Sequence, residues 1–186
     1  PLVSIVMPYY ENHRTLGACL ASFSQQGLPS RDYEIIIVDD GSQNSAQEVL
    51  KELDLPVKPV LLHCNRGGQS AATNVGIRAA RGKLLMMTCA DIIATEKLLE
   101  THLEAHKKAS DAVAVVGHLM YPPTWKLTPF MHYLQNSVRQ FGYHNIQDPE
   151  HLEPNYLYAP NFSVARAVML QAGLFDEKLP YGWQDT

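Results

Sequence analysis

The chain has 186 residues, 46% of them hydrophobic and 18% charged, and its formal net charge is −4. This composition is typical of one globular domain with a sizeable core, and the lack of any basic run argues against nucleic acid as a partner. No apolar stretch reaches the ~20 residues that span a bilayer and no basic leader opens the chain, so we expect neither a transmembrane segment nor a secretory signal.

Short apolar runs alternate with helical patterns in the first two thirds of the chain. The clearest helix is predicted over residues 95–109, with Thr95 as its N-cap. Continuous apolar strands separated by helices are typical of a parallel sheet that is covered on both faces. We therefore predict an α/β fold, a Rossmann-like α/β/α sandwich with a mostly parallel central sheet. The predicted strands cover residues 2–7, 33–38, 57–64, 83–89 and 112–119.

After Tyr121 the pattern is less regular. The sequence PPTW, residues 122–125, predicts a rigid loop, and a helix is predicted near residues 127–141. A polar linker follows to about residue 155. Residues 158–173 then predict a strand followed by a helix.

Histidine and cysteine residues do not form a recognisable metal motif. His102 and His106 are four residues apart in a predicted helix, and we interpret them as part of a solvated helix face. His63 and Cys64 are interpreted as a strand-end histidine beside a buried thiol. The three cysteines are an odd and sparse set, which indicates free thiols in a reducing, cytoplasmic compartment. Peripheral membrane association would have to come from sequence outside this chain.

Acidic residues follow three of the predicted strands. Tyr10 and Glu11 follow the first strand, Asp39 and Asp40 the second, and Asp91 the fourth. Ligands of open α/β sheets bind beyond the carboxyl ends of the strands, so these residues should meet at one binding edge. The alternatives are a polar turn closed by glycine after the second strand, and a carboxylate that caps the next helix after the fourth.

An acidic edge can hold a phosphate group only through a divalent cation, and Mg²⁺ and Mn²⁺ prefer such oxygen ligands. The carboxylates can also accept hydrogen bonds from a base or a ribose, and Tyr10 offers a ring face on which a base can stack. Neither G-x-G-x-x-G nor G-x-x-x-x-G-K-[ST] occurs, which argues against a dinucleotide dehydrogenase or a P-loop enzyme. The inferred ligand is therefore a nucleotide diphosphate held by a metal ion.

Five segments stand out in chain order: VSIVMPYYEN (3–12), YEIIIVDDGSQN (33–44), NRGGQSAATNVGIRAARGKLLMM (65–87), CAD (89–91) and NFSVARAVMLQAGLFDEKLPYGWQD (161–185). Together they resemble the inverting GT-A glycosyltransferases over nearly the whole chain. The resemblance implies transfer of a sugar from a nucleotide-diphosphate sugar, usually a UDP-sugar, to a hydroxyl acceptor such as a glycan, with inversion. It also implies one GT-A domain over residues 1–186, with a nucleotide-binding part over about 1–120 and an acceptor-side part over about 121–186.

The same resemblance implies roles for individual residues. Tyr10 would stack on the base, while Asp39 and Asp40 would contact the base and the ribose. Asp91 stands for the last Asp of a D-x-D motif, which binds the Mn²⁺ or Mg²⁺ that bridges the diphosphate. Asp185, which follows GLFDE, stands for the catalytic base. The residues implied to bind the donor substrate are Pro8, Tyr10, Glu11, Asp39, Asp40, Gly68 and Asp91.

Three positions depart from the family pattern. Glu11 stands where Asn is usual, Thr73 stands where a basic residue often precedes Asn74, and Cys89 stands for the first Asp of D-x-D. Cys89 should weaken metal binding, because a neutral thiol is a poor ligand for Mg²⁺ or Mn²⁺. Family members normally continue beyond the base, so we expect a truncated piece. Two alternatives stay open: a catalytically weak or dead nucleotide-binding module, and a sugar nucleotidyltransferase, whose Gly-rich basic loop is absent after the first strand.

Overall fold

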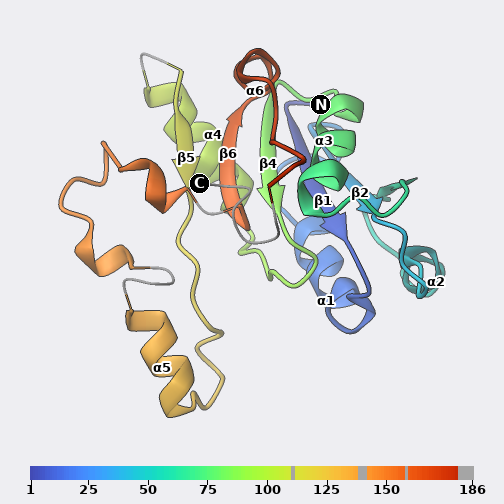
Figure 1. Cartoon of the computed structure of the whole chain (residues 1–186), viewed down its shortest axis with the longest axis horizontal. Helices are drawn as coiled ribbons and strands as arrows, with labels where there is room; N and C mark the ends of the chain where they lie inside the picture. Colours follow the sequence, from blue (N-terminus) through green and yellow to red (C-terminus); the bar gives the residue numbers. More distant parts are fainter. Residues whose placement is uncertain (110–111, 138–141, 158, 180–186) are drawn as a thin grey trace.

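The computed structural model describes residues 1–109, 112–137, 142–157 and 159–179. Within these residues, one six-stranded sheet has the strand order β3-β2-β1-β4-β6-β5 (Figure 1). The first four strands of the chain run parallel, and β6 is antiparallel to both of its neighbours, β4 and β5. The predicted, mostly parallel α/β sheet is therefore confirmed. The strands are β1 (Val3–Tyr9), β2 (Tyr33–Asp39), β3 (Val60–His63), β4 (Leu84–Thr88), β5 (Ala114–Val116) and β6 (Asn161–Ala165).

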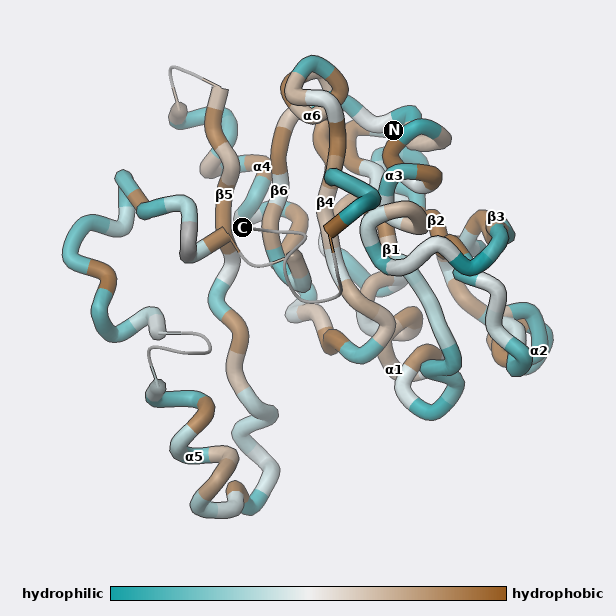
Figure 2. Tube along the Cα trace, viewed as in Figure 1, coloured by the Kyte–Doolittle hydropathy of each residue, from teal (hydrophilic) through white to brown (hydrophobic). Residues whose placement is uncertain are grey.

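Helices cover both faces of this sheet, and hydrophobic residues concentrate on the strands between them (Figure 2). The face that carries Ile5 and Met7 of β1 packs against Leu16 of α1. The opposite face carries Val6 and packs against Ile77 of α3. Every residue of β2 is buried, as expected for a strand that is covered on both faces. The helices are α1 (His13–Ser24), α2 (Ala46–Lys51), α3 (Gln69–Ala79), α4 (Leu98–Lys108), α5 (Pro129–Asn136) and α6 (Arg166–Ala172), with 3₁₀ turns at Tyr143–Asn145 and Pro154–Tyr156.

Three predicted element boundaries are wrong. Strand β3 covers only Val60–His63 and not residues 57–64. Helix α4 begins at Leu98 and has Lys97 at its N-cap position, so Thr95 is not its cap. Strand β5 has only three residues, and they are partly exposed because β5 lies at the edge of the sheet and pairs with β6 alone. The strand and helix predicted over residues 158–173 are confirmed as β6 and α6.

The interpretation of His102 and His106 as a solvated helix face is also wrong. His102 is buried, and both rings reach from α4 to β6, where His102 Nδ1 lies 2.7 Å and His106 Nε2 lies 2.8 Å from Ser163 Oγ. Burial, and then the neighbouring His106, lower the pKa of His102 to about 4. Burial also lowers the pKa of His106. Two neutral imidazoles therefore fasten α4 to a central residue of β6.

Strand β5 ends at the same edge of the sheet as β1 to β4, because it is antiparallel to β6, which is antiparallel to β4. After β5 come residues 117–137, which we call the arm and which contain α5. Helix α5 lies apart from the sheet (Figure 1) and has no buried residue. The side chains of Trp125, Phe130 and Tyr133 are 57–66% exposed. No helix among the described residues is long and apolar enough to span a membrane.

Candidate functional site

The turn after β2 carries two buried carboxylates. Asp39 accepts hydrogen bonds from Ser42 N at 2.9 Å, Ser45 Oγ at 3.0 Å and Ala46 N at 3.3 Å, so it holds the start of α2. Burial by itself would raise the pKa of Asp39, but these hydrogen bonds outweigh it and the net shift is downward. Asp39 is therefore ionised, with part of its acceptor capacity used inside the protein.

Asp40 fixes the start of α3. Its two carboxylate oxygens accept hydrogen bonds from the backbone N–H groups of Gly67 at 2.7 Å and Gly68 at 2.9 Å. Gly68 has a φ of +87° and open space where a Cβ would lie. The backbone can therefore be approached closely at this point, next to a helix N-terminus that favours negative charge. Two of the predicted site residues, Asp40 and Gly68, are in direct contact.

Both carboxylates also have the loop-forming role that was the alternative for this turn. Gly41 follows them with a φ of +70°, a conformation that glycine adopts without strain. A carboxylate group offers about four lone-pair sites, so these internal bonds leave acceptor capacity for a ligand. Loop formation and ligand binding are therefore compatible for Asp39 and Asp40.

Tyr10 lies directly after β1, and 43% of its surface is exposed. The guanidinium carbon of Arg66 lies 3.8 Å from the centre of the Tyr10 ring, so one ring face is already covered by a cation–π contact. A base has the opposite face available, or it can displace the guanidinium. The Arg66 contact could not be seen in the sequence, because it joins the end of β1 to the loop before α3.

Glu11 ties the loop after β1 to the loop after β2. Its carboxylate accepts hydrogen bonds from Gln43 N and from the Asn44 side chain at 2.8 Å, and Ser42 Oγ accepts one from Glu11 N at 3.1 Å. The bond from the Asn44 side chain, and then that from Gln43, lower the pKa of Glu11. Glu11 has a φ of +50°, a region that Asn tolerates better than Glu. The hydrogen bonds offset the strain at this departure from the family pattern.

The loop after β4 places Asp91, an exposed residue, at the same edge of the sheet. Helix α1 holds this loop, because Thr15 Oγ1 donates to Ala90 O at 2.8 Å and Cys19 Sγ donates to Cys89 O at 3.4 Å. Asp91 is not the cap of the next helix, because α4 begins well after it and has Lys at its N-cap position. The helix-cap alternative for Asp91 is therefore wrong.

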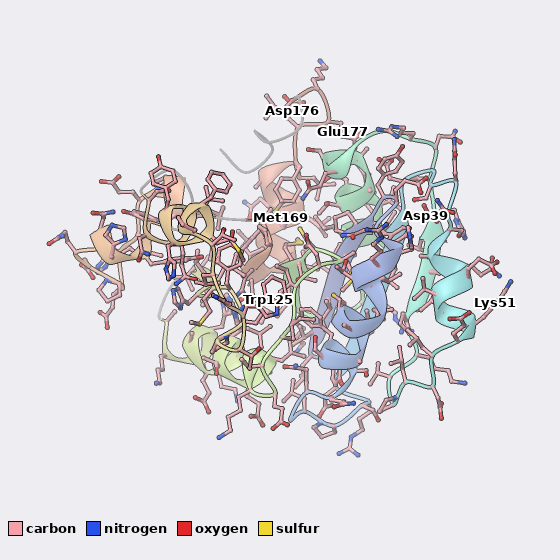
Figure 3. All side chains as sticks on the ribbon, turned by 90° about the horizontal axis from the view of Figure 1, so that it is seen from below. Asp39, Lys51, Trp125, Met169, Asp176 and Glu177 are labelled. Carbon is pink, nitrogen blue, oxygen red and sulfur yellow. The ribbon has the colours of Figure 1, made fainter. Side chains whose placement is uncertain are left out.

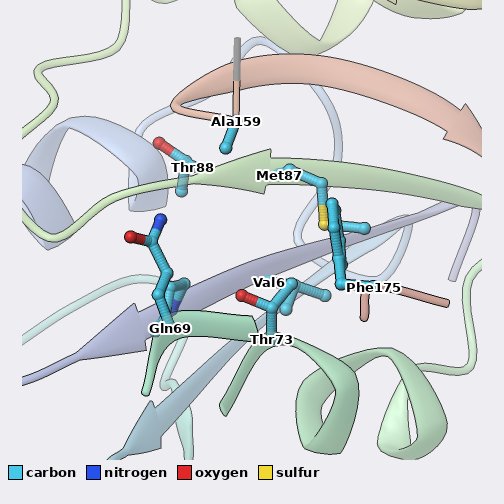
Figure 4. A pocket seen from close by; sticks show the side chains of 8 residues that line it. Val6, Gln69, Thr73, Met87, Thr88, Ala159 and Phe175 are labelled. Carbon is cyan, nitrogen blue, oxygen red and sulfur yellow. The ribbon is translucent and has the colours of Figure 1, made fainter. Parts of the chain in front are cut away.

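A small pocket lies between the carboxyl ends of β1 and β4 and the first turns of α3 (Figure 4). Pro8, one of the predicted site residues, lines it. Thr88 Oγ1 is buried there and has no hydrogen-bond partner among the described residues. A buried hydroxyl without a partner is costly, so it marks a place where a polar ligand group can bind. The full lining is Val6, Pro8, Gln69, Thr73, Met87, Thr88, Ala159 and Phe175.

Sequence reasoning missed several residues of this pocket. Thr88 directly precedes Cys89, and Gln69 directly follows Gly68. Their positions next to these motif residues could have indicated that they belong to the site. Phe175 comes from a distant part of the chain, and nothing in the sequence placed it beside β4. Asp185, the predicted catalytic base, lies outside the described residues.

Comparisons with known proteins give a consistent result. The sequence profile of Glycosyl transferase family 2 matches residues 4–169. A poly(ribitol-phosphate) beta-glucosyltransferase of Bacillus spizizenii is 34% identical over 113 residues, which cover 59% of this chain and 18% of that protein. A validoxylamine A glucosyltransferase of Streptomyces hygroscopicus is 25% identical over 206 residues, covering 98% of this chain and 45% of that protein. The chain therefore spans less than half the length of these two relatives.

Solved structures share the fold. The crystal structure of S. aureus TarS in complex with UDP matches with a TM-score of 0.75 at 16% identity, over 98% of this chain and 52% of that one. A mannosyltransferase from Pyrobaculum calidifontis, in complex with GDP-Man and Mn²⁺, matches with a TM-score of 0.71 at 17% identity, over 100% of this chain and 50% of that one. The predicted GT-A architecture is confirmed, and the family profile spans most of the sequence. The chain belongs to glycosyl transferase family 2.

Proposed function

We propose that this chain binds a nucleotide-diphosphate sugar, in particular a UDP-sugar, and transfers the sugar to a hydroxyl acceptor such as a glycan, with inversion. The observation that carries the proposal is the placement of Tyr10, Asp40 and Asp91 at one sheet edge in a chain of this family. The TarS structure with UDP supports the choice of nucleotide. The two glucosyltransferase relatives support a hexose as the transferred sugar.

The uridine would bind over the loops after β1 and β2. Asp39 and Asp40 have lone pairs beyond those used by their own loops, and these can accept hydrogen bonds from the base and the ribose. Tyr10 offers its uncovered ring face to the base. The diphosphate would then lie toward Gly68, where the start of α3 presents backbone N–H groups and open space.

A divalent metal is part of the proposal. No three His, Cys, Asp or Glu side chains of the described residues form a group that could hold a metal ion. Mg²⁺ and Mn²⁺ are nevertheless often held by one or two carboxylates together with substrate phosphates and water, and the exposed Asp91 fits that donor set. When bound, the ion would stabilise the charge that develops on the leaving diphosphate.

Asp185 is proposed as the general base that takes the proton of the acceptor hydroxyl. Its assignment rests on its position after GLFDE, a segment whose Phe175 and Glu177 are hydrogen-bonded to Asn74 of α3. A base of this kind contributes ~10²–10⁴-fold to a rate. Residues 121–186 would provide the acceptor side of the site.

A thermal-shift screen with UDP, ADP and GDP, each with and without Mn²⁺, tests the binding half of the proposal. A ligand that binds only the folded state adds RT ln(1 + [L]/Kd), about 2.7 kcal/mol at 100 times Kd. We expect the largest shift with UDP plus Mn²⁺. Release of UDP from UDP-glucose or UDP-N-acetylglucosamine, with water or added sugars as acceptors, tests the catalytic half. Binding of UDP without any turnover would favour the alternative of a catalytically dead nucleotide-binding module.

A further inference from the structure

The chain that leaves α6 makes a tight turn at two successive residues in the left-handed region. Gly173 has a φ of +97° and Leu174 a φ of +69°, and Leu174 N donates to Met169 O at 3.2 Å. Glycine adopts this conformation freely, but a leucine rarely does. Such strain persists only where the surrounding structure holds the backbone on several sides.

The side chain of Asn74 in α3 holds the backbone that follows this turn. Its side chain is 1% exposed, and it bonds the backbone of Phe175 in both directions: Nδ2 donates to Phe175 O at 2.9 Å, and Oδ1 accepts from Phe175 N at 3.1 Å. Nδ2 also donates to Glu177 Oε1 at 2.9 Å. Glu177 lies next to α3 in Figure 3, and Arg78 Nη2, one turn further along that helix, is 3.8 Å from the same carboxylate. The buried amide of Asn74 thus bonds to the backbone of a segment that pairs with no strand among the described residues.

The hydrogen bonds between Asn74 and Phe175 also concern the pocket, because Phe175 is part of its lining. Phe175 lines the pocket together with Val6 and Met87, beside which it lies in Figure 4. Thr73, the neighbour of Asn74, lines it as well. Helix α3 therefore connects two parts of the site: Asp40 binds the N–H groups of Gly67 and Gly68 directly before the helix, and Asn74 within it binds the returning segment.

We propose that Asn74 is a positioning residue for sugar transfer. It locks residues 174–177 onto α3, places Phe175 in the wall of the pocket, and fixes where the chain that continues to Asp185 leaves the helix. The role rests on the proposed transferase function, in which Asp185 is the base. Because Asn74 bonds neither to the loops after β1 and β2 nor to Asp91, its loss should affect turnover and leave UDP binding unchanged.

Asn74→Asp is the most selective change. The new carboxylate has the same shape and can still accept from Phe175 N, but it meets Phe175 O and the Glu177 carboxylate without a hydrogen to donate. We expect kcat for UDP-glucose hydrolysis to fall on the order of 10- to 100-fold, since a misplaced catalytic group costs that much, while the Kd for UDP changes less than about twofold. Adding Glu177→Gln, whose amide can donate to the carboxylate, should restore part of the rate. Gln47→Glu, the same change of an amide to a carboxylate at an exposed position of α2, is the matched control.

Hydrogen exchange gives a second readout that needs no activity. The Phe175 amide donates to Asn74, so its exchange should be slow in the wild type and fast in Asn74→Leu. An unchanged kcat in Asn74→Asp, or a UDP affinity that falls in parallel with kcat, would overturn the positioning role. So would a Phe175 amide that exchanges equally fast in all variants. If the wild type bound UDP but released no sugar from any donor, the proposed function would fail instead, and the exchange data would still decide whether Asn74 holds Phe175.

Discussion

Asp40 joins the turn after β2 to the start of α3, and its charge can be tested apart from its shape. Asp40→Asn keeps the size of the side chain but replaces one of its two oxygens by an NH₂ group. Either the N–H group of Gly67 or that of Gly68 then loses its hydrogen-bond acceptor. We expect the free energy of unfolding to fall by ~1–3 kcal/mol, and the preference for UDP over ADP and GDP to disappear. Urea unfolding and thermal shifts measure the two effects.

The exposed Asp54, substituted in the same way, is the matched control for this experiment and should change neither quantity. A variant that lost stability but kept the full preference for UDP would show that Asp40 only forms the loop. The base and ribose contacts would then have to come from Asp39 and Tyr10 alone.

We propose that Asp91 would supply one carboxylate to the metal, while Cys89 stands at the position from which a second would come. We therefore expect Mn²⁺ to bind weakly alone and clearly when UDP is present, because the diphosphate completes the ligand shell. Each ligand should tighten the other by the same factor. Calorimetric titration of Mn²⁺ should show that Asp91→Ala loses this coupling, while Cys89→Asp gains affinity for the ion. Asp54→Ala is the control, and equal UDP affinity with Mn²⁺ and with a chelator would exclude Asp91 as a ligand.

The histidines that join α4 to β6 make the stability of the protein depend on pH. The pKa of His102 is lowered to about 4 in the folded state, against ~6.5 when it is unfolded. The unfolded chain therefore binds more protons between these values, so stability is complete above about pH 6.5 and is lost as the pH falls toward 4. The expected loss is on the order of 3 kcal/mol.

Urea unfolding between pH 4.5 and 7.5 measures this dependence. His102→Gln removes the titrating group and should flatten the pH profile, although the variant loses stability at neutral pH. His132→Gln, at an exposed position of α5, should leave the slope as it is in the wild type. An identical slope in His102→Gln would mean that other groups cause the acid sensitivity.

Just before β4 begins, the chain at Gly82 passes very close to the backbone of β1. A Cβ on Gly82 would lie 2.5 Å from Ser4 N and 2.7 Å from the carbonyl carbon of Val3, both backbone atoms of the neighbouring strand β1. Gly82→Ala must therefore push β4 away from β1, and we expect it to cost more than about 2 kcal/mol of unfolding free energy. In contrast, Gly17→Ala in α1 meets nothing closer than 3.9 Å and should be neutral or stabilising by up to ~1 kcal/mol. Equal effects of the two substitutions in chemical denaturation would refute the argument.

At the scale of the whole molecule, the sheet and the acidic edge could be predicted because both depend on local patterns. Apolar runs gave the strands, and parallel order then brought Asp39, Asp40 and Asp91 to one edge. Contacts between distant segments could not be predicted. The bond of His102 to Ser163 and that of Asn74 to Phe175 depend on three-dimensional packing that leaves no periodic signal in the sequence.

The arm, residues 117–137, leads away from the closely packed α/β/α sandwich and should open independently of it. No residue of α5 is buried, so few contacts oppose local unfolding there. We expect limited trypsin digestion to cut after the exposed Lys126 before it cuts at Lys51 or Arg78, which are held in α2 and α3. The cut chain should stay together on gel filtration, because β6 lies between β4 and β5 and so joins the two fragments in one sheet.

Fragment masses identify the first site, and Lys126→Gln should remove that pair of fragments without changing the rate of later cuts. The nicked protein should also keep its thermal shift with UDP, since the loops after β1 and β2 and the start of α3, where we propose that the nucleotide binds, all precede the cut. An earliest cut at Lys51 or Arg78 would show that the sandwich opens more easily than the arm. Fragments that separated without denaturant would show that pairing of β6 with β4 and β5 does not hold the two parts together.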